Sequence, residues 1–82
     1  MIQHDINLGV VGAAGRMGLA IIRHAMSDEE FSIIHPFEYP AFTRYQLDVY
    51  DSRENKMVPL KLIKGIDKFN KRLDVLIDFS LP

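Results

Sequence analysis

The feature that most constrains this chain is a short apolar stretch followed by three glycines at three-residue spacing, Gly12, Gly15 and Gly18. A pyrophosphate needs backbone N–H donors and the positive end of a helix within contact distance, and only a chain with almost no side chains can come that close. We expect Gly12 to make the tight turn off a strand, Gly15 to let the backbone approach phosphates, and Gly18 to let a helix lie against the strand. The run therefore predicts the first strand, loop and helix of a dinucleotide-binding unit.

The residues on both sides of the loop have the character that such a unit requires. The usual fingerprint is G-x-G-x-x-G, so this loop is a variant in which Ala14 stands near the place of the second glycine. Apolar residues before the loop fit a strand buried on both faces. Those after it recur at helical spacing, at Gly18, Ile21, Ile22, Ala25 and Met26. With this context, a dinucleotide loop is favoured over a plain turn.

Two segments resemble one enzyme family. The run from Val11 to Gly18, with its Gly-Arg-Met-Gly, is similar to the N-terminal signature of the dihydrodipicolinate reductase family, and residues 74–82 (DVLIDFSLP) are similar to that family's Asp-Val-x-Ile-Asp-Phe-Thr/Ser-x-Pro strand. The resemblance implies a nicotinamide-dependent reductase of lysine and diaminopimelate biosynthesis that acts on 4-hydroxy-tetrahydrodipicolinate. It implies cofactor contacts at Gly12, Ala13, Ala14, Gly15, Arg16, Met17 and Gly18, and a nicotinamide-side contact at Phe79 and Ser80. The family frequently has a basic residue where this chain has Leu81.

Glu38 is the candidate for holding the adenine-side ribose. It lies 20 residues after Gly18 and follows a predicted second strand over residues 31–37, where dinucleotide-binding folds place an acidic residue that accepts hydrogen bonds from the ribose. The alternative is a solvated surface glutamate. Tyr39-Pro40 follow it in place of an arginine, with Arg44 a few residues on, which favours NADH slightly over NADPH; the family often uses both.

The rest of the chain predicts a second strand-helix-strand unit. Residues 41–56 show no clean period and predict a loop-rich connection, whose aromatic residues could flank an adenine or cover the edge of a core: Phe42, Tyr45 and Tyr50. Residues 57–63 predict a third strand, residues 66–73 a short amphipathic helix, and residues 74–79 a central fourth strand. Pro36 cannot donate to a ladder, so pairing on that side of its strand should stop there, and Pro59 should give its strand an edge position or a late start.

The fold class predicted is therefore α/β, a Rossmann-type parallel sheet with flanking helices, truncated to about four strands and two helices. The 82 residues predict a single N-terminal dinucleotide-binding domain over residues 1–82. The net charge of −1 argues against nucleic acid or anionic membranes as partners, and no signal or membrane segment is visible, so we expect a cytoplasmic protein. There are no cysteines and the three histidines have no metal-ligand spacing, so no metal site is expected.

The resemblance also limits the functional prediction. Members of the family are about three times as long, form homotetramers, and carry their substrate-binding and catalytic residues in a second domain, so no catalytic residue is assigned here and the chain alone is expected to be inactive. Three alternatives stay open: a non-catalytic nucleotide-binding or regulatory domain, the cofactor domain of another small dehydrogenase such as a homoserine or aspartate dehydrogenase, and an interaction module that self-associates through an open sheet edge.

Overall fold

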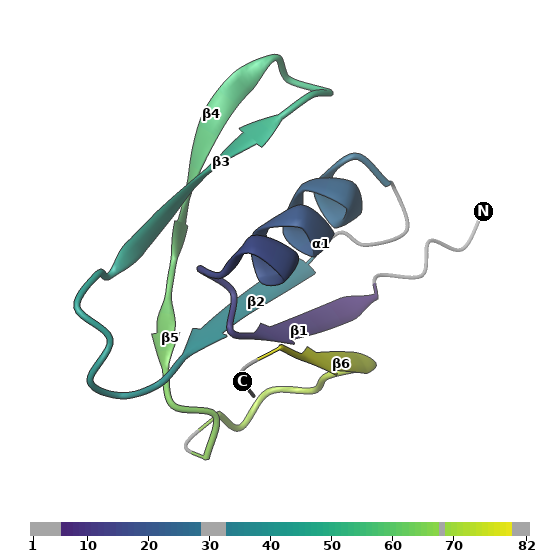
Figure 1. Cartoon of the computed structure of the whole chain (residues 1–82). Helices are drawn as coiled ribbons and strands as arrows, with labels where there is room; N and C mark the ends of the chain where they lie inside the picture. Colours follow the sequence, from purple (N-terminus) through teal and green to yellow (C-terminus); the bar gives the residue numbers. More distant parts are fainter. Residues whose placement is uncertain (1–5, 29–32, 68, 80–82) are drawn as a thin grey trace.

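In the part of the chain that the structure describes, one helix lies against a parallel sheet (Figure 1). The computed structural model describes residues 6–28, 33–67 and 69–79. Within these residues the elements follow one another as β1 (Asn7–Val11), α1 (Arg16–Met26), β2 (Ile33–Glu38), β3 (Gln46–Asp51), β4 (Lys56–Lys61), β5 (Ile63–Lys64) and β6 (Val75–Asp78).

The four-stranded sheet has the order β5-β2-β1-β6, and each of its three pairings is parallel. The apolar run of β1 occupies the centre, with Leu8 opposite Ile34 of β2 and Val75 of β6. A parallel sheet must be covered on its faces, so its central strands are apolar on both sides. The predicted Rossmann-type α/β fold is confirmed. Residues 74–79 were predicted to form a central strand, and this was wrong: they form β6, which lies at the edge of the described sheet because β1 is its one neighbour among the described strands.

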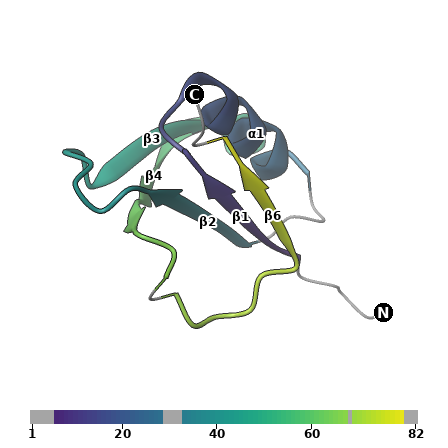
Figure 2. The same ribbon diagram turned by 60° about the horizontal axis from the view of Figure 1, so that its bottom comes forward.

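Helix α1 covers one face of this sheet, and the ribbon formed by β3 and β4 packs against the helix on the β2 side (Figures 1 and 2). The core lies between these layers, where eight buried residues form one cluster: Leu8, Val10, Ala13, Ile22, Ala25, Leu47, Val49 and Leu62. The helical spacing of the apolar positions thus turns one side of α1 towards the sheet and the ribbon.

The close contact between α1 and the preceding loop depends on Gly18. A Cβ atom at Gly18 would lie 2.3 Å from the Gly12 carbonyl oxygen and 2.9 Å from the Ala13 Cα, both rigid backbone atoms. At Gly15, by contrast, a Cβ would meet only the Gly12 oxygen, at 3.4 Å, and the backbone is in an ordinary extended conformation (φ −77°, ψ 173°). Gly18 is therefore required by packing inside the protein, and Gly15 is not.

Residues 41–56 were predicted to be a loop-rich connection, and this was wrong, because β3 lies within them and pairs antiparallel with β4. Leu47, Val49 and Asp51 alternate with exposed residues, which is the two-residue period of a half-buried strand. At the turn, Asp51 Oδ1 accepts hydrogen bonds from the amides of Arg53 (2.9 Å) and Glu54 (3.4 Å). A polar strand with only two apolar side chains facing inwards was too short a pattern to stand out.

The predicted third strand, residues 57–63, is divided between two sheets. Its first part is β4, which pairs only with β3, and its last residue begins β5, which pairs with β2 through Ile63 and Lys64. Leu62 separates the two parts, and its amide donates to the Tyr45 carbonyl (2.9 Å). The third parallel strand is thus two residues long, and the ribbon that leads into it is an added layer.

Neither proline interrupts its strand. The Phe37 carbonyl accepts hydrogen bonds from the loop after β1, so it faces β1. The polar groups of successive strand residues point to opposite sides, and the nitrogen of Pro36 therefore faces β5. Pairing with β1 therefore continues through Pro36. On the side that the proline nitrogen faces, pairing with β5 begins only at the next residue, Phe37, and does not stop at Pro36 as predicted. Pro59 lies opposite Asp48 on the ribbon's outer strand, at a position between hydrogen-bonded pairs, as expected for an edge.

The second helix predicted over residues 66–73 was wrong for the part of this segment that the structure describes, residues 66, 67 and 69–73, where no helix occurs. Phe69 instead packs its ring edge-on against His35 (4.9 Å) and Phe37 (5.0 Å) on the face of the sheet away from α1. Leu73 reaches the same face, where its Cδ1 lies 3.1 Å from the position of a Cβ on Gly9. An isolated eight-residue helix is marginal, so ring contacts to the sheet decide the path of the chain.

The start of β1 is fixed to the residue before β6 by paired hydrogen bonds. The Asn7 amide donates to Asp74 Oδ2 (2.8 Å), and the Asp74 amide donates back to the Asn7 carbonyl (2.9 Å). The bond from the Asn7 backbone, then that from its side chain, lowers the pKa of Asp74, with a smaller contribution from Arg72. His35 Nε2 lies 3.3 Å from the Asn7 Oδ1 atom, so this corner joins three neighbouring strands.

We expect Gly18→Ala to lower the free energy of unfolding by about 1–3 kcal/mol, because the added methyl group collides with backbone atoms that cannot move independently. Gly15→Ala is the matched control and should change it by less than about 1 kcal/mol, because its Cβ would meet only the Gly12 carbonyl oxygen, at 3.4 Å. Urea denaturation of the two variants measures both values. Equal losses at the two positions would contradict this account of Gly18.

Stability should also depend on the protonation of His35. Burial, and then the positive charge of Lys71, lower the pKa of His35 from its ordinary value. The folded state therefore favours the neutral imidazole, so the stabilisation is complete above the ordinary pKa of about 6.5 and is lost as the pH falls through the lower, folded value. Urea denaturation between about pH 7 and pH 5 should show this loss. This loss of stability should be smaller in His35→Gln. It should be unchanged in the control His24→Gln, which alters an exposed residue of α1. The same pH dependence of stability in His35→Gln and in the unaltered protein would refute the prediction.

Candidate functional site

A cavity of about 710 Å³ opens at the carboxyl ends of the parallel strands, a volume typical of small-molecule sites. In open α/β sheets ligands bind at this end, where the strand order reverses, here between β1 and β6. Its described lining comes from three segments of the chain and the end of β6: Val11, Gly12, Ala14, Gly15, Phe37, Glu38, Tyr39, Pro40, Phe42, Gly65, Ile66, Asp67 and Phe79.

The glycine loop forms one wall of the cavity and is fixed by the end of β2. Gly12 has φ +80°, a conformation that favours glycine, and turns the chain sharply off β1. The amides of Gly12 and Ala13 both donate to the Phe37 carbonyl, at 3.0 and 3.1 Å, and the Gly15 amide donates back to Gly12 (3.1 Å). The loop therefore has a defined shape before any ligand is present.

Helix α1 begins directly at this wall. Gly15 is its N-cap and supplies no side-chain hydrogen bond, and the first turn contains no acidic residue. The first intrahelical bond runs from the Leu19 amide to Gly15, so the amides of Arg16, Met17 and Gly18 have no carbonyl partner within the helix. These N–H groups and the positive end of the helix dipole can bind an anion.

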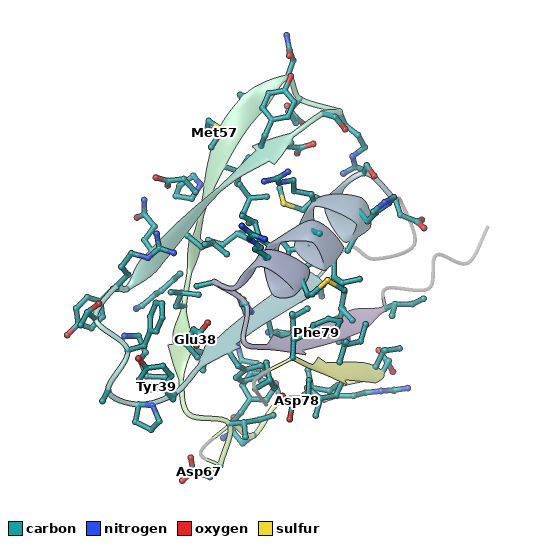
Figure 3. The ribbon with its side chains drawn as sticks, viewed as in Figure 1. Glu38, Tyr39, Met57, Asp67, Asp78 and Phe79 are labelled. Carbon is teal, nitrogen blue, oxygen red and sulfur yellow. The ribbon has the colours of Figure 1, made fainter. Side chains whose placement is uncertain are left out.

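Glu38 lies at the end of β2 and faces the glycine loop (Figure 3). The residue is 8% exposed, and its Oε2 accepts a hydrogen bond of 2.8 Å from the Ala14 amide. This bond occupies one lone pair, and an ionised carboxylate can accept about four hydrogen bonds. Glu38 can therefore hold the loop and still accept bonds from hydroxyl groups in the cavity.

The structure brings five of the ten predicted site residues together as lining of one cavity: Gly12, Ala14, Gly15, Glu38 and Phe79. Phe79 comes to the cavity because its amide donates to the Val11 carbonyl (2.9 Å), which continues the pairing of β6 with β1. The others lie elsewhere. Ala13 is buried in the core, and Gly18 packs against the backbone of Gly12 and Ala13. Arg16 and Met17 are exposed in the first turn of α1 and do not line the cavity. Ser80 lies outside the described residues.

Sequence reasoning missed the far end of the cavity, which is formed by Tyr39, Pro40, Gly65, Ile66 and Asp67. The available signal was Gly65, since a glycine directly after a parallel strand marks a turn at the ligand-binding edge; its φ is +86°. Of the three aromatic residues considered for an adenine contact, Phe42 lines the cavity, whereas Tyr45 and Tyr50 do not.

Carboxylates are the charged groups among the described lining residues, Glu38 and Asp67, and no lysine, arginine or histidine is found there. Lys64 is close by, but its ammonium group is directed to the Phe42 carbonyl and lies over the rings of Phe42 (5.5 Å) and Tyr45 (4.3 Å). The end of the cavity away from the helix is thus acidic, while the helix end is electropositive.

Across the described ranges no helix is long and apolar enough to cross a membrane. The same part of the chain holds no group of three or more histidine, cysteine, aspartate or glutamate side chains arranged to bind a metal ion.

Comparison with known proteins agrees with the geometry. The chain is 27% identical to the 4-hydroxy-tetrahydrodipicolinate reductase of Methylococcus capsulatus over 77 residues, and 29% identical to the enzyme of the same name from Psychrobacter arcticus. Each match covers 94% of this chain but 29% and 28% of the relative, so the chain spans less than a third of their length. No solved structure matches the chain with significance. The family model described as "Dihydrodipicolinate reductase, N-terminus" matches residues 6–82, and the chain therefore belongs to the family of dihydrodipicolinate reductase N-terminal domains.

Proposed function

We propose that this chain is the cofactor-binding segment of a 4-hydroxy-tetrahydrodipicolinate reductase and that its cavity holds a nicotinamide dinucleotide. The observation that carries the proposal is Gly15. Its backbone is one that any residue adopts, and a Cβ atom there would meet only the Gly12 carbonyl oxygen, at 3.4 Å, an ordinary contact. The absence of a side chain at this position serves a ligand that approaches the backbone.

The proposed contacts follow the cavity from the helix outwards. The pyrophosphate lies along Gly12, Ala14 and Gly15, and takes hydrogen bonds from the first-turn amides, those of Arg16 and Met17, because the loop amides already have partners within the protein. Ala13 and Gly18 support the loop from the core side. Glu38 accepts hydrogen bonds from the adenine-side ribose.

At the other side of the loop, Phe79 at the end of β6 borders the nicotinamide half, with Ser80 next to it in sequence. When bound, the cofactor supplies a hydride for the reduction of 4-hydroxy-tetrahydrodipicolinate to tetrahydrodipicolinate. The chain's own residues bind and orient the dinucleotide, and the groups that recognise the substrate are expected in the two thirds of the relatives that this chain does not match.

We further propose that the site prefers NADH to NADPH. The carboxylate of Glu38 is held beside the loop by the Ala14 amide, so a 2′-phosphate on the ribose would bring two like charges together. The described lining offers no lysine or arginine to offset that repulsion.

Gly15→Val should abolish dinucleotide binding while leaving the fold intact, because a β-branched side chain would occupy the space in front of the helix N-terminus. Calorimetric titration with NADH gives the affinity, and urea denaturation checks that stability changes by less than about 1 kcal/mol. Unchanged NADH affinity in a folded Gly15→Val protein would show that the pyrophosphate binds elsewhere.

Glu38→Gln should weaken NADH binding by about tenfold and should narrow the difference between NADH and NADPH, because the amide keeps the size of the side chain and loses its charge. The control is Asp48→Asn, which alters an exposed carboxylate on the ribbon, outside the cavity lining. Calorimetry with both dinucleotides measures the effect. Tighter binding of NADPH than of NADH by the unaltered protein would exclude the proposed preference. If the folded chain bound neither dinucleotide, an interaction module would be favoured.

The chain alone is expected to be inactive, so NADH absorbance in the same samples should stay constant when substrate is added.

A further inference from the structure

The turn that follows β5, residues Gly65 to Asp67, closes the end of the cavity furthest from α1. Its position relative to Glu38 is fixed by the backbone, because β5 pairs with β2 and the Gly65 amide donates to the Glu38 carbonyl (2.8 Å). A second bond, from the Phe69 amide to the Ile66 carbonyl (3.0 Å), closes the turn on its other side. In Figure 3 Asp67 lies on this turn beyond Tyr39, away from the helix.

Asp67 and Pro40 approach each other across Gly65. A Cβ atom on Gly65 would lie 3.0 Å from Asp67 Oδ1 and 3.4 Å from Pro40 Cγ, and φ is +86° at this position. The carboxylate of Asp67 is thus turned back over Gly65, and Asp67 is one of the residues that line the cavity. The glycine leaves room for this arrangement, which brings a charged acceptor to the end of an otherwise apolar surface.

The surface beside Asp67 suits a flat aromatic ligand. It is formed by Tyr39, Pro40, Phe42 and Ile66, and the rings of Tyr39 and Phe42 meet edge to face with their centroids 5.4 Å apart. Tyr39 is 60% exposed and Ile66 39% exposed, so both offer apolar surface to a ligand without first being uncovered. A base that stacks here would bury this surface.

The order of the subsites places a base at this surface. This step rests on the proposed function: if phosphates lie at the N-terminus of α1 and the ribose lies at Glu38, the base attached to that ribose lies beyond Glu38, where Tyr39, Ile66 and Asp67 line the cavity. Adenine carries an exocyclic amine, which donates hydrogen bonds, whereas hypoxanthine and guanine carry a carbonyl oxygen at the same ring position. A carboxylate accepts from the amine and repels the carbonyl.

We propose that Asp67 determines base specificity in this site, its carboxylate accepting a hydrogen bond from the exocyclic amine of adenine. The described lining contains no cation that would turn the preference towards a carbonyl oxygen. Asp67 is exposed, so the expected discrimination is that of one charge-assisted hydrogen bond at a wet surface, about tenfold between adenine and hypoxanthine.

The test compares NADH with reduced nicotinamide hypoxanthine dinucleotide, which carries a carbonyl oxygen in place of the amine and a protonated ring nitrogen beside it. We expect the unaltered chain to bind NADH about tenfold more tightly in calorimetric titrations. Asp67→Asn keeps the size of the side chain and adds an amide that can donate to the carbonyl, so the two dinucleotides should bind within about twofold of each other. Asp67→Ala should also lose the discrimination, and Asp48→Asn should keep it.

The other outcomes are distinct. Two results would overturn the role of Asp67 without contradicting the proposed cofactor site. One is equal affinity of the unaltered chain for the two dinucleotides, and the other is a change of both affinities by the same factor in Asp67→Asn. Either result would show that the carboxylate acts by charge or solvation alone. Failure of the folded chain to bind either dinucleotide would overturn the proposed function together with this inference. Melting curves identify variants that do not fold. If one of the two Asp67 variants does not fold, the other still tests whether the discrimination between the dinucleotides is lost.

Discussion

The geometry of the cavity depends on three consecutive loop amides that are bound by the last two residues of β2. Gly12 and Ala13 donate to the Phe37 carbonyl, and Ala14 donates to the Glu38 carboxylate. Ordering a loop of small residues costs much backbone entropy, and these hydrogen bonds help to offset that cost. The end of β2 therefore determines where the loop lies, and with it where the N-terminus of α1 is directed.

The bond to the Ala14 amide gives Glu38 a structural role that the sequence did not predict, in addition to the proposed contact with a ribose. A buried carboxylate is stabilised only when its lone pairs are satisfied, and the Ala14 amide satisfies one of them without any ligand. The same bond holds the side chain in place, so a ribose would meet an acceptor that is already ordered. Preorganisation of this kind lowers the entropy that binding must overcome.

The parts of the fold that could be predicted are those in which a local pattern and the sheet requirement coincide. The apolar run of β1, the helical spacing from Gly18 to Met26 and the apolar strand β6 each allow one interpretation, and all three elements form as predicted. The apolar character of β6 did not reveal its place, which is the edge of the described sheet and not its centre. The predictions for residues 41–56 and 66–73 were wrong for the same reason. Their structure is decided by contacts with distant elements, the helix in the case of Leu47 and Val49 and the sheet in the case of Phe69.

The candidate site shows the same division. The glycine loop, Glu38 and Phe79 could be located because each follows a strand whose place in a parallel sheet is known. Tyr39, Ile66 and Asp67 could not, because their position depends on β5, a strand of two residues with no pattern of its own. The length of a strand thus limits what its sequence reveals, although two residues suffice to fix Gly65 against Glu38.

The comparison of Gly15 with Gly18 shows how a structure without a ligand can still carry information about one. Gly18 is explained inside the protein, since a side chain there meets backbone atoms at 2.3 and 2.9 Å. Gly15 has no positive φ, and a Cβ atom there would meet only the Gly12 oxygen, at 3.4 Å. Glycine without a side-chain cap costs a helix N-terminus only a few tenths of a kcal/mol relative to serine. The proposed pyrophosphate would need the N-terminus of α1 uncovered in this way.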